Sequence, residues 1–143
     1  MNCEIVILEQ IHVNSVIEIA EACGLSRRDS NLLQINSERN DYILLVSLRA
    51  GEVSGFIEAQ IIADEIHLYD VAVAPKFRRQ GLAEALIEKL IELPYDVILL
   101  EVRESNLAAL QLYKKCGFAI DGIRKNYYSA PVENAVLMSR KLS

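Results

Sequence analysis

Two arginines, a glutamine and a glycine follow one another at Arg78, Arg79, Gln80 and Gly81, between an apolar alternating segment and a helical one. The first N–H groups of a helix have no partner inside it and lie at the positive end of its dipole. Gly81 would let a ligand approach the backbone closely, and the small Ala83 would keep that approach open. Such a turn suits a phosphate or pyrophosphate, although solvated strand-to-helix turns that contain a glycine are also common.

The segments on either side of this turn are assigned from their hydropathy. Residues His67–Ala74 alternate in polarity and predict a strand, and Pro75 ends it because proline cannot donate to a strand ladder. Residues Gly81–Glu92 predict a helix, because five apolar side chains recur at helical spacing. They are Leu82, Leu86, Ile87, Leu90 and Ile91. The turn should therefore hold its ligand between the end of a strand and the start of a helix.

The remaining periodic segments predict an α/β protein with a mixed, mostly antiparallel sheet of seven strands and about four helices, in the order βααβββαβαββ. The other expected strands are Cys3–Leu8, Asp41–Arg49, Val53–Ile62, Val97–Val102, Phe118–Tyr128 and Ala135–Lys141. The other expected helices are Val13–Cys23, Ser26–Asn36 with Ser26 as its cap, and Leu107–Cys116. The helix Gly81–Glu92 joins the fourth strand to the fifth, which implies a right-handed parallel crossover within that sheet.

Composition limits the class of protein. The 143 residues suit one domain spanning 1–143, and 52% hydrophobic with 24% charged residues is typical of soluble globular proteins. The net charge of −5 argues against a nucleic-acid binder. No apolar run is long enough to span a membrane, and MNCEIVILEQ does not resemble a signal peptide. Three scattered cysteines predict neither a disulfide framework nor a metal site, and fit the cytoplasm.

Two linked blocks resemble the GNAT superfamily of acetyl-CoA-dependent N-acetyltransferases. The block from Val71 to Ala83 resembles the pyrophosphate loop of that superfamily, R/Q-x-x-G-x-G/A. The block from Glu101 to Phe118 contains its N-x-x-A-x-x-L-Y-x-x-x-G-F pattern. The matching residues are Asn106, Ala109, Leu112, Tyr113, Gly117 and Phe118. Together the two blocks and the elements between them cover roughly residues 68–120.

Three further segments are similar to the bacterial ribosomal-protein-alanine N-acetyltransferases, or RimI family, within that superfamily. They are residues 100–103, 123–128 and 133–138. That family acetylates the N-terminal alanine of the eighteenth small-subunit ribosomal protein. The chain departs from its pattern at three places: Leu25 stands where tryptophan is usual, the connection Ile91–Asp96 is short, and Asn134 replaces an acidic residue.

The resemblance implies a set of acetyl-CoA contacts. Val71, Ala72 and Val73 would line the pantetheine arm, with the backbone of the two valines pairing as an added strand would. Arg78 and the residues after it would surround the pyrophosphate: Arg79, Gln80, Gly81, Leu82, Ala83 and Glu84. Asn106 would cap the helix that follows it and also contact the cofactor.

The resemblance also implies two catalytic residues, Glu101 and Tyr113. Glu101 would be the general base, because a neutral amine must attack the thioester and a free α-amine has a pKa near ~7.8. The alternative is an exposed carboxylate paired with Arg103. Tyr113 would protonate the leaving thiolate, with an ordinary tyrosine pKa near ~10 against ~8.5 for a thiol. The alternative is an aromatic residue that only packs.

The predicted function is transfer of acetyl from acetyl-CoA to a protein N-terminal α-amine, most like that of the ribosomal-protein-alanine family. The expected partner is a protein N-terminus or peptide, with a ribosomal protein as one candidate, and the expected state is a monomer or weak dimer. One alternative is an acetyltransferase for a small amine such as a polyamine or aminoglycoside. Another is a non-catalytic acetyl-CoA-binding module, against which the pair Glu101 and Tyr113 argues.

Overall fold

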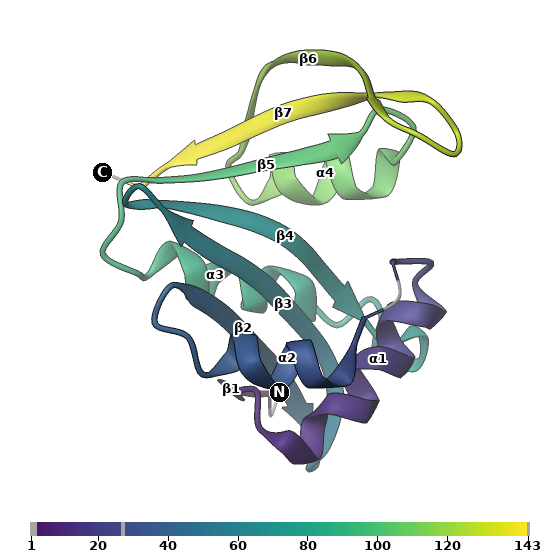
Figure 1. Ribbon diagram of the computed structural model, residues 1–143, viewed down its shortest axis with the longest axis vertical. Coiled ribbons are helices and arrows are strands. Elements are labelled where there is room, and N and C mark those ends of the chain that lie inside the picture. The colour runs from purple at the N-terminus through teal and green to yellow at the C-terminus, as the bar shows by residue number, and fades with distance from the viewer. Residues whose placement is uncertain (1–2, 27, 143) are drawn as a thin grey trace.

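A seven-stranded sheet in the order β1-β2-β3-β4-β5-β7-β6 forms the frame of the computed structural model, which describes residues 3–26 and 28–142 (Figure 1). The strands are β1 Glu4–Ile7, β2 Tyr42–Arg49, β3 Glu52–Ile62, β4 Glu65–Val73, β5 Val97–Arg103, β6 Ala119–Tyr128 and β7 Glu133–Lys141. Neighbouring strands run antiparallel except β4 and β5, which are parallel. The element order confirms the predicted α/β fold βααβββαβαββ, including the parallel crossover between the fourth and fifth strands.

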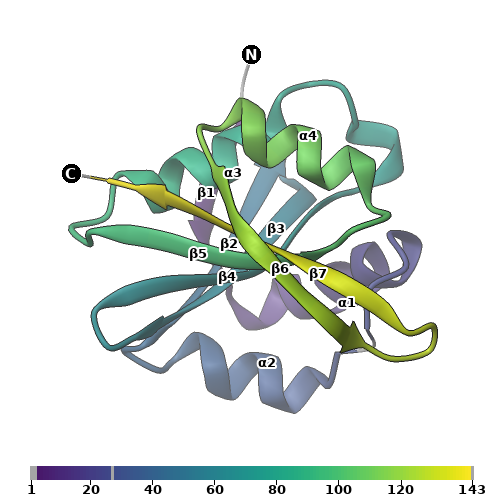
Figure 2. The same cartoon turned by 90° about the horizontal axis from the view of Figure 1, so that it is seen from above.

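Helices cover both faces of the sheet. The helices are α1 Val13–Ala22, α2 Ser30–Ser37, α3 Leu82–Ile91 and α4 Leu107–Lys115, with 3-10 turns η1 Gln10–His12 and η2 Pro75–Phe77. Figure 1 shows α1 and α2 over the near face, and Figure 2 shows α4 and α2 on opposite sides of the strands. No helix in the described ranges is both long enough and apolar enough to cross a membrane.

Two apolar clusters hold these layers together. On one face, α3 and α4 bury Leu86, Ile87, Leu90 and Tyr113 against β3, β4 and β5. On the other face, α1 and α2 bury a second group against β2, β3 and the end of β4, including Phe56. Full burial of such side chains contributes about 1.5–3 kcal/mol each, so the two clusters fix the strands from both sides.

The strands β4 and β5 separate soon after they meet. They pair at only two positions, Ile66 with Ile98 and His67 with Leu99 (Figure 1). The register of β4 against β3 shifts at the same point, since Leu68 pairs with Ala59 and Asp70 pairs with Glu58. Tyr69 is therefore the extra residue of a β-bulge, and a bulge bends a strand and increases its twist. The edge of β4 from Leu68 onward is thereby turned away from β5, and a V-shaped split opens between them.

The second helix differs from its prediction. It begins at Ser30 instead of Ser26, and the carboxylate of Asp29 accepts the Leu32 N–H at 2.9 Å. The predicted cap at Ser26 is therefore wrong, because Asp29 provides the acceptor that the first turn requires. Arg28 precedes this cap and lies beside the sheet, where its Nε donates to Oε1 of Glu58 at 3.2 Å.

Candidate active site

The turn predicted to bind pyrophosphate has an open backbone in the structure. Gly81 caps α3 with φ 75°, in the left-handed region that favours glycine, and Arg79 precedes it with φ 64°. A Cβ added at Gly81 would meet nothing within 4 Å. A hollow of about 190 Å³ lies over this turn, lined by Val73, Phe77, Arg78, Arg79, Gly81, Leu82, Ala83 and Glu84. Space above the turn, together with free N–H groups at the start of α3, fits an anionic ligand such as pyrophosphate.

The side chains of the turn do not all face the same way. Arg79 is exposed and free to reach an anion, whereas Arg78 also contacts Cys23 at the end of α1, with 3.5 Å between Nη2 and Sγ. The Oε1 atom of Gln80 is buried and has no hydrogen-bond partner in the part of the chain that the structure describes. The carboxylate of Glu84 forms an ion pair with Lys115 of α4, with 3.2 Å between Oε1 and Nζ. Glu84 could therefore contribute to a phosphate-binding site only through its backbone N–H.

The predicted pantetheine segment lies on the side of β4 that faces the split. Val71, Ala72 and Val73 pair with β3 on their other edge. Their side chains divide between the two cores, with Ala72 in the cluster under α1 and Val71 packed against the cluster under α3. The Val73 carbonyl on this edge accepts from the Cys23 thiol at 3.5 Å. The other backbone groups of the edge are available to an extended ligand, as in strand addition.

The predicted general base, Glu101, lies on β5 opposite this edge. Its neighbours Leu100 and Val102 point into the cluster under α3 and α4, so strand alternation directs Glu101 to the other face, where it is exposed. Arg103 instead pairs with Glu133 of β7, with 3.2 Å between Nη1 and Oε1. Among the described residues Glu101 has no ion-pair partner, so the alternative in which Arg103 neutralises it is wrong.

The predicted proton donor, Tyr113, approaches from the opposite face. It is only 7% exposed, and its ring centroid lies 5.7 Å from that of Phe118. Burial raises the pKa of Tyr113, and the negative charge of Asp70 raises it further. The phenol therefore stays protonated across the physiological range but is a weaker acid than the ordinary tyrosine assumed from the sequence.

The negative charges of Glu101 and of Asp70 on β4 also affect the pKa of Tyr128 on β6. Burial raises the pKa of Tyr128, and both Glu101 and Asp70 add to that effect. Asp70 also raises the pKa of Tyr113, so its charge on β4 affects one tyrosine on α4 and one on β6. The sequence motifs do not include Asp70, and its one signal in the sequence is that it is a lone aspartate in the apolar strand just before Val71.

Asn106 has the capping role that its position predicts. Its Oδ1 accepts the Ala109 N–H at 3.2 Å, at the start of α4. Its side chain is exposed. The cap fixes the first turn of the helix that carries Tyr113, while contact between Asn106 and a cofactor stays a prediction.

The three departures from the resemblance are each accommodated locally. Leu25 is half-buried and packs against the cluster under α1 and α2. In the short connection between α3 and β5, Leu93 and Tyr95 pack against the opposite cluster. The Oδ1 atom of Asn134 accepts the Asn126 N–H at 3.0 Å and so joins β6 to β7.

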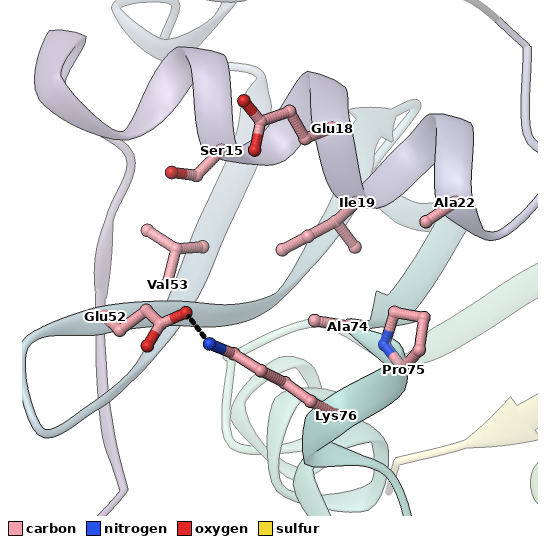
Figure 3. A pocket seen from close by; sticks show the side chains of 9 residues that line it. All are labelled: Ser15, Glu18, Ile19, Ala22, Glu52, Val53, Ala74, Pro75 and Lys76. Atoms are coloured by element: carbon pink, nitrogen blue, oxygen red, sulfur yellow. Dashed lines mark ion pairs between the residues drawn. The ribbon is translucent and has the colours of Figure 1, made fainter.

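A larger hollow lies away from the predicted catalytic residues. It measures about 410 Å³ and lies between α1 and the ends of β3 and β4 (Figure 3). Its lining residues are Ser15, Glu18, Ile19, Ala22, Glu52, Val53, Ala74, Pro75 and Lys76. Glu52 and Lys76 form an ion pair of 2.5 Å across it. A second hollow of about 410 Å³ lies beside Arg28, so volume does not identify the site. Glu101 and Tyr113 do not line the hollow of Figure 3, and the split remains the candidate active site.

Comparison with known proteins gives consistent matches. Residues 13–118 match the Acetyltransferase (GNAT) family. The ribosomal protein bS18-alanine N-acetyltransferase of Haemophilus influenzae is 38% identical over 143 residues, covering 87% of this chain and 97% of the relative. That of Escherichia coli K12 is 39% identical over 99 residues, covering 65% of this chain and 67% of the relative. The crystal structure of the Escherichia coli ribosomal-protein-S18-alanine N-acetyltransferase superposes with a TM-score of 0.86 at 30% identity, covering 99% of this chain and 95% of that one.

Proposed function

Because this chain belongs to the GNAT family of acetyltransferases, we propose that it moves acetyl from acetyl-CoA to the N-terminal alanine of ribosomal protein bS18. The observation that carries this substrate is the match to the Haemophilus influenzae enzyme, which extends over 87% of this chain and 97% of the relative. A match of that extent cannot be limited to the cofactor turn and includes at least part of β5 to β7. The cytoplasm, where ribosomal proteins are made, is the corresponding compartment.

The cofactor would bind across the turn and the split. The N–H groups at the start of α3 and the exposed Arg79 would hold the pyrophosphate over Gly81, where a Cβ would meet nothing within 4 Å. The pantetheine arm would pair with the free backbone edge of Val71 and Val73. This course brings the thioester between Glu101 and Tyr113, and Asn106 would contact the cofactor from the start of α4.

Catalysis would then use the two faces of the sheet separately. The peptide N-terminus approaches on the α1 and α2 face, where Glu101 takes a proton from the amine directly or through one water. The neutral nitrogen attacks the carbonyl carbon, and the C–S bond breaks as the tetrahedral intermediate collapses. Tyr113 donates its phenolic hydrogen to the departing sulfur from the α3 and α4 face. The nitrogen loses its second proton as the amide forms, which restores the phenol of Tyr113 through solvent, and Glu101 passes its own proton to solvent. The products are the acetylated N-terminus, the free thiol of coenzyme A and one proton.

A small cationic amine is a second candidate acceptor, because Glu101 and the oxygen of Asp70 that Arg28 leaves free place negative charge on the acceptor side. A polyamine or aminoglycoside would be drawn to this charge as readily as a peptide α-ammonium. The extended match to the bS18 enzymes favours the peptide. Parallel assays with spermidine and with an Ala-starting peptide distinguish the two.

The direct test is mass spectrometry of bS18 before and after incubation with the enzyme and acetyl-CoA. The proposal expects one added acetyl group on the N-terminal fragment and none on internal lysine fragments. The Glu101→Gln variant is the control for nonenzymatic acetylation. An unmodified N-terminus, or transfer to spermidine at a higher kcat/KM, would overturn the assignment of bS18.

A further inference from the structure

A buried arginine bridges two strands on the acceptor side of the split. Arg28, from the connection between α1 and α2, has a side chain only 10% exposed. It pairs with Glu58, with 3.1 Å between Nη2 and Oε1, and its Nη2 also pairs with Oδ2 of Asp70. Its Cζ lies 5.1 Å from the centroid of the Phe56 ring. Glu58 and Asp70 are direct cross-strand partners on β3 and β4, so one guanidinium serves both carboxylates.

The oxygens of the two carboxylates are not equally occupied. Glu58 uses both, since Oε1 accepts from Arg28 and Oε2 accepts the Tyr42 hydroxyl at 2.8 Å. Asp70 uses Oδ2 for Arg28, and within residues 3–26 and 28–142 its Oδ1 accepts no hydrogen bond. Its side chain is 32% exposed, so this oxygen can be reached. Two carboxylates and one guanidinium leave a net charge of −1, with the spare acceptor on Asp70.

Of these three residues, Asp70 lies closest along the chain to the predicted pantetheine segment. It immediately precedes Val71, at the point where the edge of β4 turns away from β5. Its charge acts on both Tyr113 and Tyr128, which flank the split. A ligand nitrogen between Glu101 and Tyr113 would therefore lie beside a carboxylate with a free oxygen.

We propose that Asp70 binds the incoming α-ammonium group through its free oxygen, and that Arg28 and Glu58 are positioning residues that fix its orientation. The proposal rests on the proposed function, because it requires an acceptor that arrives as an α-ammonium. With a pKa near ~7.8, most of a free α-amine is protonated at neutral pH. Asp70 holds that cation while Glu101 removes its proton, so binding and base catalysis belong to different carboxylates.

The substitution Asp70→Asn should leave the chain folded. Burial raises the pKa of Asp70, although the charge of Arg28 acts in the opposite direction. The folded chain therefore holds this proton more tightly than the unfolded chain, and the ionised carboxylate lowers stability at neutral pH. Removing the charge should leave the melting temperature at pH 7 unchanged or higher.

The test compares Asp70→Asn with wild type on an Ala-starting peptide at saturating acetyl-CoA. A lost charged hydrogen bond predicts a peptide KM raised by roughly tenfold or more, with kcat and the KM for acetyl-CoA within about twofold. The same peptide starting with propionyl, which lacks only the amine, should inhibit both enzymes with the same Ki. Glu52→Gln, which breaks the distant pair with Lys76 and removes one negative charge, should behave as wild type.

Two further variants make the outcome specific. Asp70→Ser should repeat the rise in KM, and Arg28→Lys should give a smaller rise because one ammonium cannot bridge both carboxylates as a guanidinium does. A KM within twofold of wild type, or a propionyl Ki that rises in parallel with KM, would overturn the role of Asp70 and leave the proposed function standing. A wild-type enzyme inactive on the Ala-starting peptide would overturn the proposed function and this inference together.

Discussion

Replacing Tyr113 with phenylalanine isolates the contribution of one hydroxyl group. The ring of Tyr113 is buried against Phe118 and the cluster under α4, and phenylalanine preserves those contacts. In the described residues the hydroxyl has no hydrogen-bond partner, so its removal orphans no other group. The free energy of unfolding should therefore change by less than about 1 kcal/mol.

The expected loss of activity follows from the environment of the hydroxyl. A positioned general acid contributes typically ~10²- to 10⁴-fold. Burial and the charge of Asp70 raise the pKa of Tyr113, which makes it a weaker donor to a thiolate. We therefore expect the lower end of that range, a fall in kcat of about 10²-fold or about 2.7 kcal/mol of transition-state stabilisation. The KM for acetyl-CoA should not change, because the turn at Gly81 is untouched.

The assay follows release of the coenzyme A thiol at saturating concentrations of both substrates. Tyr95→Phe is the matched control, since Tyr95 packs against the same cluster but precedes β5 at the end away from the split. It should keep wild-type kcat. A Tyr113→Phe enzyme with kcat within about threefold of wild type would refute the reasoning and show that water protonates the thiolate.

Two other predictions concern the cofactor turn and the acid stability of the fold. Gly81→Glu should abolish acetyl-CoA binding in calorimetry, because the new carboxylate would occupy the position of the pyrophosphate. Gly51→Glu is the control and should bind acetyl-CoA normally, since Gly51 has a φ of 81° and an added Cβ there would also meet nothing within 4 Å. Unchanged affinity in a folded Gly81→Glu protein would remove the turn from the site. Hydrogen bonds from Ser105, and then from Arg103, hold the pKa of Glu133 below its usual value of 4.5. The ionised carboxylate therefore stabilises the fold at neutral pH, and this stabilisation is lost as pH falls through the lowered pKa of the folded state. Glu133→Gln should thus lower the melting temperature at pH 7, and this deficit should shrink as pH falls below 4.5; a deficit that stays constant as the pH falls would contradict this.

The fold was predictable from the sequence because its signals are local. Alternation in β4, helical spacing in α3 and glycine at position 81 each arise within a few residues. The start of α2 was not predicted correctly, since Ser26 and Asp29 are both good caps and the choice depends on how the connection from α1 lies against the sheet.

The catalytic pair and the turn were predicted by resemblance, but their environment was not. Arg28, Glu58 and Asp70 are separated by up to 42 positions along the chain, and no periodic signal connects them. Only the paired register of β3 and β4 brings the two carboxylates together. The raised pKa of Tyr113 likewise depends on burial and on Asp70, which appear only in the folded chain.

The pH dependence of the Glu101→Gln variant shows whether Glu101 removes a proton from an α-amine. Glutamine keeps the size and hydrogen-bonding reach but is not a base, so kcat/KM on an Ala-starting peptide should fall by ~10²-fold or more at pH 7. The deficit should shrink as pH rises through ~8, because the α-amine then arrives neutral, whereas a lysine amine near ~10.4 would stay charged.

The companion substrate is the same peptide with a blocked N-terminus and an internal lysine. Wild type should acetylate the Ala-starting peptide and leave the blocked peptide unmodified. Equal rates on the two peptides, or a Glu101→Gln deficit that is constant from pH 7 to about pH 9, would contradict the assignment of Glu101 as the base for an N-terminal amine.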